Sequence, residues 1–502
     1  MSGEMWMEES VEEVKTRPVG LGRICWGVKR GKRLVCGDEV NDSRVIEETM
    51  KLVNEFINRV EKHGTVLLSG SMTPFDYAVI ALGNWLNGIA VGNGDDAIAM
   101  LRNSEHEVGK KMLKLLNQAR EKWLKTYKPE LEELIEKLRK GRARIIITGE
   151  PLNKDKSFMA HLYTENLAIE IARVAKSGNI TINISLTGLR GLHIVTPKLL
   201  NDEKLRAMQY GLLITDGSIH EYGYPVMDTT QLWQVFAWLI AWPGKNHVHV
   251  QGLGVNDSGV SITWRSSAID HKDELKSKAV VAREASKLSN EEFPAFLLYA
   301  IFGDGDVNIR KRKVELVMGK SKLKLWGSMI SRLENLGFRM DYDNGYVVTY
   351  TVKYSKAIGL ARKLLSDYLI KALIEDLSSL PDAEKLRRLS ALASMEVKPR
   401  GISSIEVANI KMSVIVQNGS VELRVRRKDY GDAVRILETL RNAGYERVEL
   451  SKRSNMYVVY ISMDVIKKYP ELTAKVCEVL RRMHEEAKNK GKEKRARSIA
   501  RQ

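Results

Sequence analysis

Two apolar stretches that end in aspartate decide the fold: MQYGLLITDGSI at residues 208–219 and LLYAIFGDGDV at residues 297–307. A helix that is apolar on every side needs burial over most of its circumference. The glycine after each aspartate lets the backbone turn out of the helix. Each stretch therefore predicts a buried helix that presents an aspartate, Asp216 or Asp304, at its carboxyl end.

The same order of elements is predicted after both aspartates. Asp216 is followed by a hairpin in SIHEYGYPVM, a helix in QLWQVFAWLIAW, a hairpin formed by HVHVQG and GVSITWR, and a helix between Asp273 and Leu288. Asp304 lies 88 residues after Asp216, and the matching segments are VNIRKRKVELVMG, KLKLWGSMISRLENLGF, RMDYDNGYVVTYTVKY and KAIGLARKLLSDYL. A single helix that ends in aspartate is common. Two such helices, each followed by the same order of strands and helices, predict a duplicated αββαββα unit with antiparallel sheets.

A further copy without the aspartate helix is predicted near the C-terminus. Val421-Glu422-Leu423 repeats Val314-Glu315-Leu316, and LRNAGY, which ends at Tyr445, repeats LENLGF, which ends at Phe338, at the same offset along the chain. Residue matches that agree with element order indicate an internal repeat. Because the apolar aspartate helix is missing, we predict no metal site in this copy.

The remaining pattern places these units in an α+β protein. A hairpin in RICWGVKRGKRLVCG precedes helices up to residue 138, and a strand, strand, helix, strand, strand order follows, with its helix in NLAIEIARVAKSG. The predicted segments are a mainly helical region at 1–140, a ββαββ segment at 141–201, the two half-units at 202–290 and 291–372, a helical linker at 373–400, and a ββαββα repeat with a basic tail at 401–502.

The charge of the chain limits its partners. Its 80 Lys and Arg exceed its 63 Asp and Glu, which leaves a formal net charge of +17. Such an excess favours nucleic acid, because each neutralised phosphate releases counterions. A surface rich in Lys, Glu and Arg also becomes basic without any partner. Charge alone leaves both interpretations open. The tail from Arg481 is rich in Lys and Arg, and it is either a solvated helix end or a phosphate contact.

The cysteines and apolar runs predict a cytoplasmic protein that is not bound to a membrane. Cys25, Cys36 and Cys477 show no CxxC spacing, so we expect neither a zinc ribbon nor a disulfide scaffold, and a reducing compartment. The chain begins with an acidic stretch that lacks an apolar signal core. Its longest apolar run, around residues 233–242, is too short to span a bilayer.

The duplicated motif resembles the single-chain LAGLIDADG homing endonucleases, in which two such helices pack at a pseudo-twofold axis. The resemblance covers residues 202–369, and the whole chain, through ITDGSI and IFGDGDV, resembles the multicopy crenarchaeal PaRep family, which is associated with mobile elements. The resemblance to the homing endonucleases implies a monomer with internal pseudo-twofold symmetry that binds double-stranded DNA at a specific site and cleaves it. The alternative is a non-catalytic DNA-binding or maturase-like RNA-splicing protein on a degenerate scaffold. Thr215 and Tyr299, which stand at the helix contact, favour that alternative.

The resemblance also implies a metal site. The acidic residue at the end of each motif binds a divalent cation beside the scissile phosphate in that family, which assigns Asp216 and Asp304, with Asp306 as the alternative to Asp304. Mg²⁺ is the cofactor expected for carboxylate, phosphate and water ligands.

Three further residues are carried over as catalytic candidates. Arg265 and Lys353 follow the aspartate of their half, Asp216 or Asp304, at the same distance along the chain, as the basic residues near the family's active site do. Ordinary solvent-facing charges are the other interpretation of this pair. Gln231 resembles the polar residue that orients the attacking water.

The sheets are expected to carry DNA recognition. Alternation with valine predicts a polar strand face, and a cluster of cations lies in the first hairpin of the second half. Such a face suits base edges and phosphates in a major groove. The residues predicted to contact DNA are His247, His249, Gln251, Arg310, Arg312 and Lys313.

Overall fold

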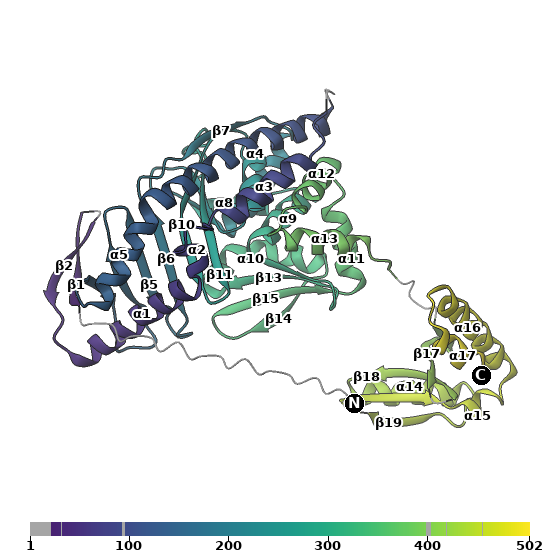
Figure 1. Cartoon of the computed structure of the whole chain (residues 1–502). Helices are drawn as coiled ribbons and strands as arrows, with labels where there is room; N and C mark the ends of the chain where they lie inside the picture. Colours follow the sequence, from purple (N-terminus) through teal and green to yellow (C-terminus); the bar gives the residue numbers. More distant parts are fainter. Residues whose placement is uncertain are drawn as a thin grey trace, which may run out of the picture. The chain divides into compact units, whose positions relative to one another are not determined.

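The computed structural model of the chain describes residues 22–31, 33–92, 96–397, 403–417, 419–453 and 455–501. The chain divides into two compact units, a first unit at 1–395 and a C-terminal unit at 396–502, and each has its own hydrophobic core (Figure 1). The predicted α+β class is confirmed. The first 21 residues, and residues 398–402 at the end of the expected linker, lie outside the described residues.

The first unit begins with the predicted hairpin of β1 (Arg23–Arg30) and β2 (Arg33–Glu39). A disulfide joins Cys25 to Cys36, which corrects the expectation that the cysteines are unpaired. The antiparallel register pairs Gly27 with Cys36, and an irregularity between Cys25 and Gly27 brings the cysteine Cα atoms to 5.5 Å. This proximity depends on strand register, which cysteine spacing alone does not reveal.

The predicted helical region follows this hairpin. Asp42 and Asp96 cap α1 and α4, because the side chain of each accepts hydrogen bonds from backbone N–H groups of the first turn. Pro129 lies in the first turn of α5, directly after the π turn Trp123–Tyr127. The helical elements are α1 (Ser43–Lys62), α2 (Gly64–Leu67), α3 (Asp76–Gly88), α4 (Ala97–Lys122), the π turn Trp123–Tyr127 and α5 (Lys128–Arg139).

Eleven of the described strands form one large sheet in the order β2-β1-β3-β4-β5-β6-β10-β11-β9-β8, with β7 paired to β10. The helix predicted in NLAIEIARVAKSG is wrong, because Leu167–Arg173 is strand β5. Leu167, Ile169 and Ile171 alternate into the core, and pairing with β4 and β6 outweighs the helix propensity of Ala, Leu and Glu. The neighbouring strands are β3 (Arg144–Gly149), β4 (Phe158–Tyr163), β6 (Ile180–Leu186) and β7 (Leu192–Thr196).

The two half-units contain the predicted elements in the predicted order. The first consists of α6 (Asp202–Ile214), β8 (Gly217–Ile219), β9 (Pro225–Thr229), α7 (Leu232–Ala241), β10 (Gly244–Asn256), β11 (Gly259–Ala268) and α8 (Lys278–Ser286). The second consists of α9 (Phe293–Asp304), β12 (Gly305–Asn308), β13 (Lys313–Gly319), α10 (Lys320–Asn335), β14 (Arg339–Asp343), β15 (Val347–Lys353) and α11 (Ser355–Leu364).

The C-terminal unit repeats the same topology. Its sheet has the order β16-β17-β18-β20-β19, the second half has β12-β13-β15-β14, and the first half ends the large sheet as β8-β9-β11-β10. When the added edge strand β16 is left out, the four strands of each copy are arranged in the sheet in the order first, second, fourth, third along the chain. The elements are β16 (Ser404–Val407), β17 (Ile410–Gln417), β18 (Ser420–Arg427), α14 (Tyr430–Asn442), β19 (Glu449–Arg453), β20 (Met456–Ile461), α15 (Met463–Ile466), α16 (Pro470–Asn489) and α17 (Glu493–Ala500).

The segment expected as a helical linker belongs to the first unit. It forms α12 (Tyr368–Leu377) and α13 (Glu384–Ser394), and α13 contacts α11 and β12. Leu386, Leu389 and Leu392 are buried in the core of that unit. Their helical spacing makes one apolar face, which requires a packing partner that a linker does not have. Among the described residues, no helix is both long and apolar enough to cross a membrane.

Candidate functional site

The two motif helices, α6 and α9, pack side by side as predicted. A methyl group in place of the Gly211 hydrogen would overlap the carbonyl oxygen of Phe296 and lie 2.9 Å from the amide nitrogen of Ala300. A methyl group at Gly303 would overlap Thr215 Oγ1 and lie 2.6 Å from Thr215 Cβ. The helices therefore approach each other most closely at these two glycines.

The contact is pseudo-symmetric, because each glycine faces its own counterpart. When the two motifs are aligned on their aspartates, Gly211 corresponds to Tyr299 and Thr215 corresponds to Gly303. A methyl group at Gly211 would lie 2.9 Å from Tyr299 Cβ, and Gly303 faces Thr215. The bulk of Tyr299 and Thr215 is thus accommodated by the glycine opposite.

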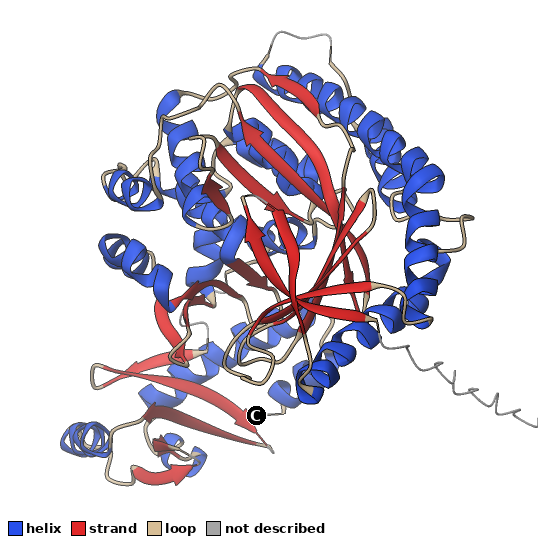
Figure 2. Ribbon diagram, turned by 90° about the vertical axis from the view of Figure 1, so that its left-hand side faces the viewer, coloured by secondary structure: helices blue, strands red, loops and turns tan. Residues whose placement is uncertain are grey.

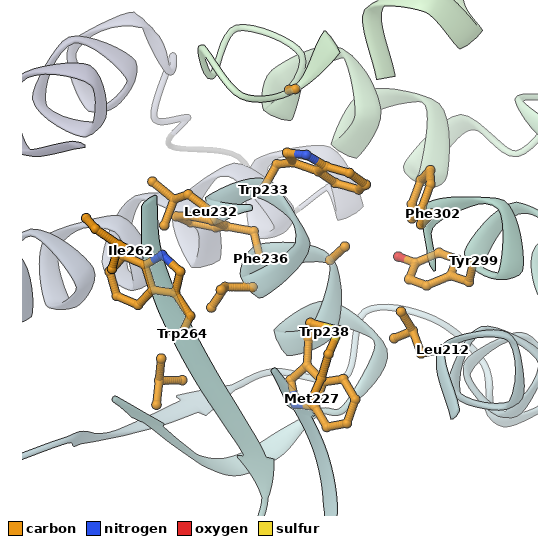
Figure 3. Close-up of a cluster of buried hydrophobic side chains, with 14 of the residues drawn as sticks. Leu212, Met227, Leu232, Trp233, Phe236, Trp238, Ile262, Trp264, Tyr299 and Phe302 are labelled. Atoms are coloured by element: carbon orange, nitrogen blue, oxygen red, sulfur yellow. The ribbon is translucent and has the colours of Figure 1, made fainter. Parts of the chain in front are cut away.

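Aromatic side chains pack around the place where α6 and α9 cross (Figure 3). Trp233 of α7 packs edge to face on Phe302 of α9, with ring centroids 5.1 Å apart. The ring centroid of Tyr299 lies 4.9 Å from that of Phe302. All three side chains are buried, and burial raises the pKa of the Tyr299 hydroxyl. The central helix of the first half is therefore anchored on the motif helix of the second.

Each motif aspartate has a hydrogen-bonding partner at the same position of its half. Gln234 Nε2 donates to Asp216 Oδ2 at 3.2 Å, and Lys322 Nζ donates to Asp304 Oδ2 at 3.1 Å. Each donor is the third residue of the following helix, α7 or α10. The repeat therefore places an amide in one half where it places an ammonium group in the other.

The two aspartates are neighbours at the shared end of α6 and α9. A methyl group at Gly303 would lie 3.2 Å from Asp216 Cγ. Lys322, the partner of Asp304, also lies 3.4 Å from the carbonyl oxygen of Thr215. Burial, and then the charge of Asp304, raises the pKa of Asp216, as expected for adjacent carboxylates.

Three lysines converge on these helix ends. Lys278 Nζ donates to the carbonyl oxygen of Thr215 at 3.1 Å, and Lys322 binds Asp304. Lys385 Nζ lies 3.2, 2.9 and 3.1 Å from the carbonyl oxygens of residues 301, 302 and 303. Carbonyls at a helix C-terminus carry partial negative charge, which favours cations there. Burial lowers the pKa of both Lys278 and Lys385, while the nearby aspartates oppose that shift.

Arg265 and Lys353 are engaged elsewhere. Arg265 donates from Nε and Nη2 to the two oxygens of Asp228, both at 2.6 Å. Lys353 Nζ donates to Asp341 Oδ1 at 2.7 Å. In the described residues, each basic side chain is thus paired on its own sheet, and no hydrogen bond or ion pair joins either one to a motif aspartate.

In the described residues, neither Gln231 nor Asp306 forms a hydrogen bond or ion pair with a motif aspartate. Gln231 is the N-cap residue of α7, and Gln234, three positions later, makes the bond to Asp216. Asp306 lies 3.5 Å from Arg388 Nη1. Gln234 and Lys322 follow their aspartates at the same spacing, and this was the sequence signal for two residues that we did not predict.

The imidazole rings of His247 and His249 lie in a row with that of His193. The ring centroids of His193 and His247, and of His247 and His249, are each 5.2 Å apart. Burial lowers the pKa of His247, and lowers that of His249 to about 4, so both are neutral at pH 7. Among the described residues, no three His, Cys, Asp or Glu side chains are arranged to hold a metal ion. His247 and His249 therefore offer uncharged hydrogen-bonding groups.

The other residues predicted to contact DNA are spread over two sheets. Gln251 occupies the β-bulge between Val250 and Gly252 of β10. Arg310 and Arg312 are exposed at the turn between β12 and β13, and Lys313 pairs with Glu315 at 2.5 Å.

The large sheet has one buried face and one polar face. Along β6, β11 and residues 244–251 of β10, alternate side chains are buried in the core and those between them stay at least partly exposed. Figure 2 shows the strands, in red, with helices packed against them. The polar face carries Thr181, Asn183, Ser185, His247, His249, Ser261, Thr263, Arg265 and Ser267.

The first unit thus contains two α+β segments with the same order of elements, and their helices α6 and α9 pack together and end beside two neighbouring aspartates. No protein-family model matches the chain, and no curated protein is similar to it. Among solved structures it is similar to the crystal structure of full-length DUF199/WhiA from Thermatoga maritima, with 11% identity and a TM-score of 0.22. The match covers 40% of this chain and 63% of that one, less than two thirds of its length. A TM-score this low does not support a functional conclusion, so the function must be inferred from the site.

Proposed function

We propose that this protein binds double-stranded DNA on a scaffold of LAGLIDADG type and does not cleave it through a metal ion. The observation that carries the proposal is the set of partners around the two motif aspartates. Lys322 neutralises Asp304, Gln234 binds Asp216, and two further lysines occupy the helix-end carbonyls.

The donor set does not fit Mg²⁺. That ion requires about six oxygen ligands in near-octahedral geometry. The oxygens available are those of Asp216 and Asp304 and the carbonyls at the ends of α6 and α9, and most of these already accept from an amide or ammonium group. A divalent cation placed there would also face three positive charges at close range. We therefore derive no cleavage step for this site.

Three properties support DNA as the partner. The polar face of the large sheet presents hydroxyl, amide and imidazole groups, which are the groups that read base edges in a major groove. The net charge of +17 favours a polyanion. A pseudo-twofold protein matches the local dyad of a duplex. Double-stranded RNA is a weaker match, because its major groove is too deep and narrow for side chains to read.

The first test is binding and cleavage by the full-length protein. A randomised DNA duplex, a single strand and an RNA duplex are mixed with it in Mg²⁺, Mn²⁺ or EDTA at constant ionic strength. We expect mobility shifts of the DNA duplex that do not depend on the metal, and intact strands on denaturing gels, because the lysines already supply the cationic charge.

Cleavage that Asp216→Asn or Asp304→Asn abolishes, and that the control Asp306→Asn retains, would restore the nuclease hypothesis. Preferred binding of RNA would favour the splicing alternative. Absence of binding to all three nucleic acids would overturn the proposal.

The polar sheet face gives a second prediction. Replacing Thr181, Asn183 and Thr263 with alanine should weaken binding to a selected target about tenfold or more, since each good base contact contributes roughly 1–3 kcal/mol. Fluorescence anisotropy titrations of selected and random duplexes measure this loss. The matched control replaces three exposed polar residues on helices α1 and α4, Asn54, Asn117 and Gln118. Equal losses in both variants would show that the sheet face does not read DNA.

A further inference from the structure

The positive charge of the chain is concentrated in its C-terminal unit. Residues 396–502 contain 24 Lys and Arg and 14 Asp and Glu, so this unit carries +10 of the total +17. Within it, the segment 481–502 contains nine Lys and Arg and three Glu, which leaves a net charge of +6. Such a density exceeds that of the much longer first unit, 1–395, which carries the remaining +7.

The tail folds into a helical hairpin that displays this charge. Helix α16 ends before Gly491, which adopts a φ of 64°, and α17 folds back onto α16. Ala496 and Ile499 of α17 are buried, and the carbonyl oxygen of Ala496 lies 3.0 Å from His484 Nδ1. All nine basic side chains of the hairpin are exposed: Arg481, Arg482, Lys488, Lys490, Lys492, Lys494, Arg495, Arg497 and Arg501.

Only part of this charge is neutralised within the protein. Three of the cations form ion pairs, Arg482 with Glu478, Lys490 with Glu486 and Arg497 with Glu493. In the described part of the chain, no ion pair involves Arg481, Lys488, Lys492, Lys494 or Arg495. A solvated helix of mixed charge gains from ion pairs along its surface, and these five residues do not form them.

We propose that the α16–α17 hairpin binds the phosphate backbone of nucleic acid, independently of sequence. The proposal rests on the proposed function only in taking DNA as the partner, and it adds a second contact surface. Phosphate contacts position a protein on the duplex, whereas base contacts provide its specificity. The hairpin therefore strengthens binding by the whole chain without altering its sequence preference.

An anionic membrane is a poorer fit to this surface. Helices that lie on membranes insert an apolar face. Among the described residues of α16 and α17, no large hydrophobic side chain is exposed, since the apolar residues of both helices face the core of the unit. The charge is thus displayed without the apolar anchor that a lipid surface requires.

The test is the salt dependence of DNA binding by the full chain. In Lys488→Ala/Lys494→Ala/Arg495→Ala, the slope of log K against log salt should become shallower by about 2 to 3, since each phosphate contact contributes about 0.9. The preference for a selected over a random duplex should not change. The matched control is Arg447→Ala/Lys467→Ala/Lys468→Ala, which removes three exposed charges from other parts of the same unit. We expect its slope to equal that of the unaltered protein, and circular dichroism verifies that both variants are folded.

An unchanged slope in the hairpin variant, with DNA binding by the unaltered protein intact, would overturn this inference and leave the proposed function standing. Equal slope changes in both variants would also overturn it, because a diffuse field would then act. Loss of binding to phosphatidylserine vesicles in place of a DNA effect would assign the hairpin to membranes. Failure of the unaltered protein to bind DNA at low salt would remove the proposed function itself.

Discussion

Gly211→Ala will lower the free energy of unfolding of the first unit by about 3 kcal/mol, at the upper end of the range for overpacking. The added methyl group would overlap the carbonyl oxygen of Phe296 and approach the amide nitrogen of Ala300. Both are backbone atoms in a buried helix, so neither can rotate away. Urea unfolding followed by tryptophan fluorescence measures this effect on the first unit alone, because all nine tryptophans precede residue 396.

The control is Gly83→Ala in α3. No atom lies within 4 Å of the position that its methyl group would occupy. Replacing glycine by alanine inside a helix normally stabilises it by roughly 0.5–1 kcal/mol. If both variants were equally stable, α6 and α9 would not cross at Gly211.

The second glycine of the crossing permits a compensation experiment. A methyl group at Gly303 meets a side chain, that of Thr215, rather than backbone. By itself, Gly303→Ala should therefore destabilise the first unit. Adding Thr215→Gly should restore most of the lost unfolding free energy. We expect a coupling energy on the order of 1 kcal/mol from the double-mutant cycle. Additive losses would show that residues 215 and 303 do not contact each other.

Glu105→Gln will stabilise the first unit by about 3 kcal/mol at pH 7. Glu105 lies in α4 with its side chain fully buried, and burial, followed by the charge of Asp376, raises its pKa to about 9. Asp376 itself joins α12 to α4 through an ion pair with Arg102 at 3.0 Å. At pH 7, folding therefore requires Glu105 to take up a proton beside a second carboxylate.

The sign of the pH dependence follows from this shift. An unfolded glutamate loses its proton near pH 4.5, whereas folded Glu105 retains it to about pH 9. Its favourable contribution is complete below pH 4.5 and is lost as the pH rises through 9. Glutamine resembles the protonated form, so the variant should show a flatter dependence of unfolding free energy on pH between 5 and 9.

Glu107→Gln is the matched control on the same helix. Glu107 is exposed, and its hydrogen bond with Lys110 lowers its pKa. We expect its unfolding midpoint to match that of the unaltered protein across this range. An equally steep pH dependence in Glu105→Gln and the unaltered chain would contradict the buried, protonated carboxyl.

Local periodicity determined most of the elements of this protein. The uninterrupted apolar runs before Asp216 and Asp304 required buried helices, and the repeated order after them required duplicated half-units. Residue matches at one constant offset identified the C-terminal copy for the same reason. Such patterns are sufficient because the spacing of apolar residues alone decides which side of a helix or strand must be buried.

Tertiary structure decided the elements whose local signals were weak or ambiguous. The segment 167–173 is rich in amino acids that favour a helix, yet strands on both sides make it β5. Cys25 and Cys36 are joined because of the register of their hairpin. The leucines of α13 looked like part of a linker until a core was present to bury them.

Tertiary structure also decided the chemistry of the site. The sequence placed two aspartates at helix ends, and the repeat predicted that these two aspartates lie next to each other. Two of the cations around them come from distant segments, since Lys278 and Lys385 lie far along the chain from the carbonyls that they bind. Both reach the helix ends only because α8 and α13 pack there. Spacing along the chain reveals which side chains share a face, but the partner of a buried charge is set by contacts between segments far apart in sequence, and only the folded protein brings these together.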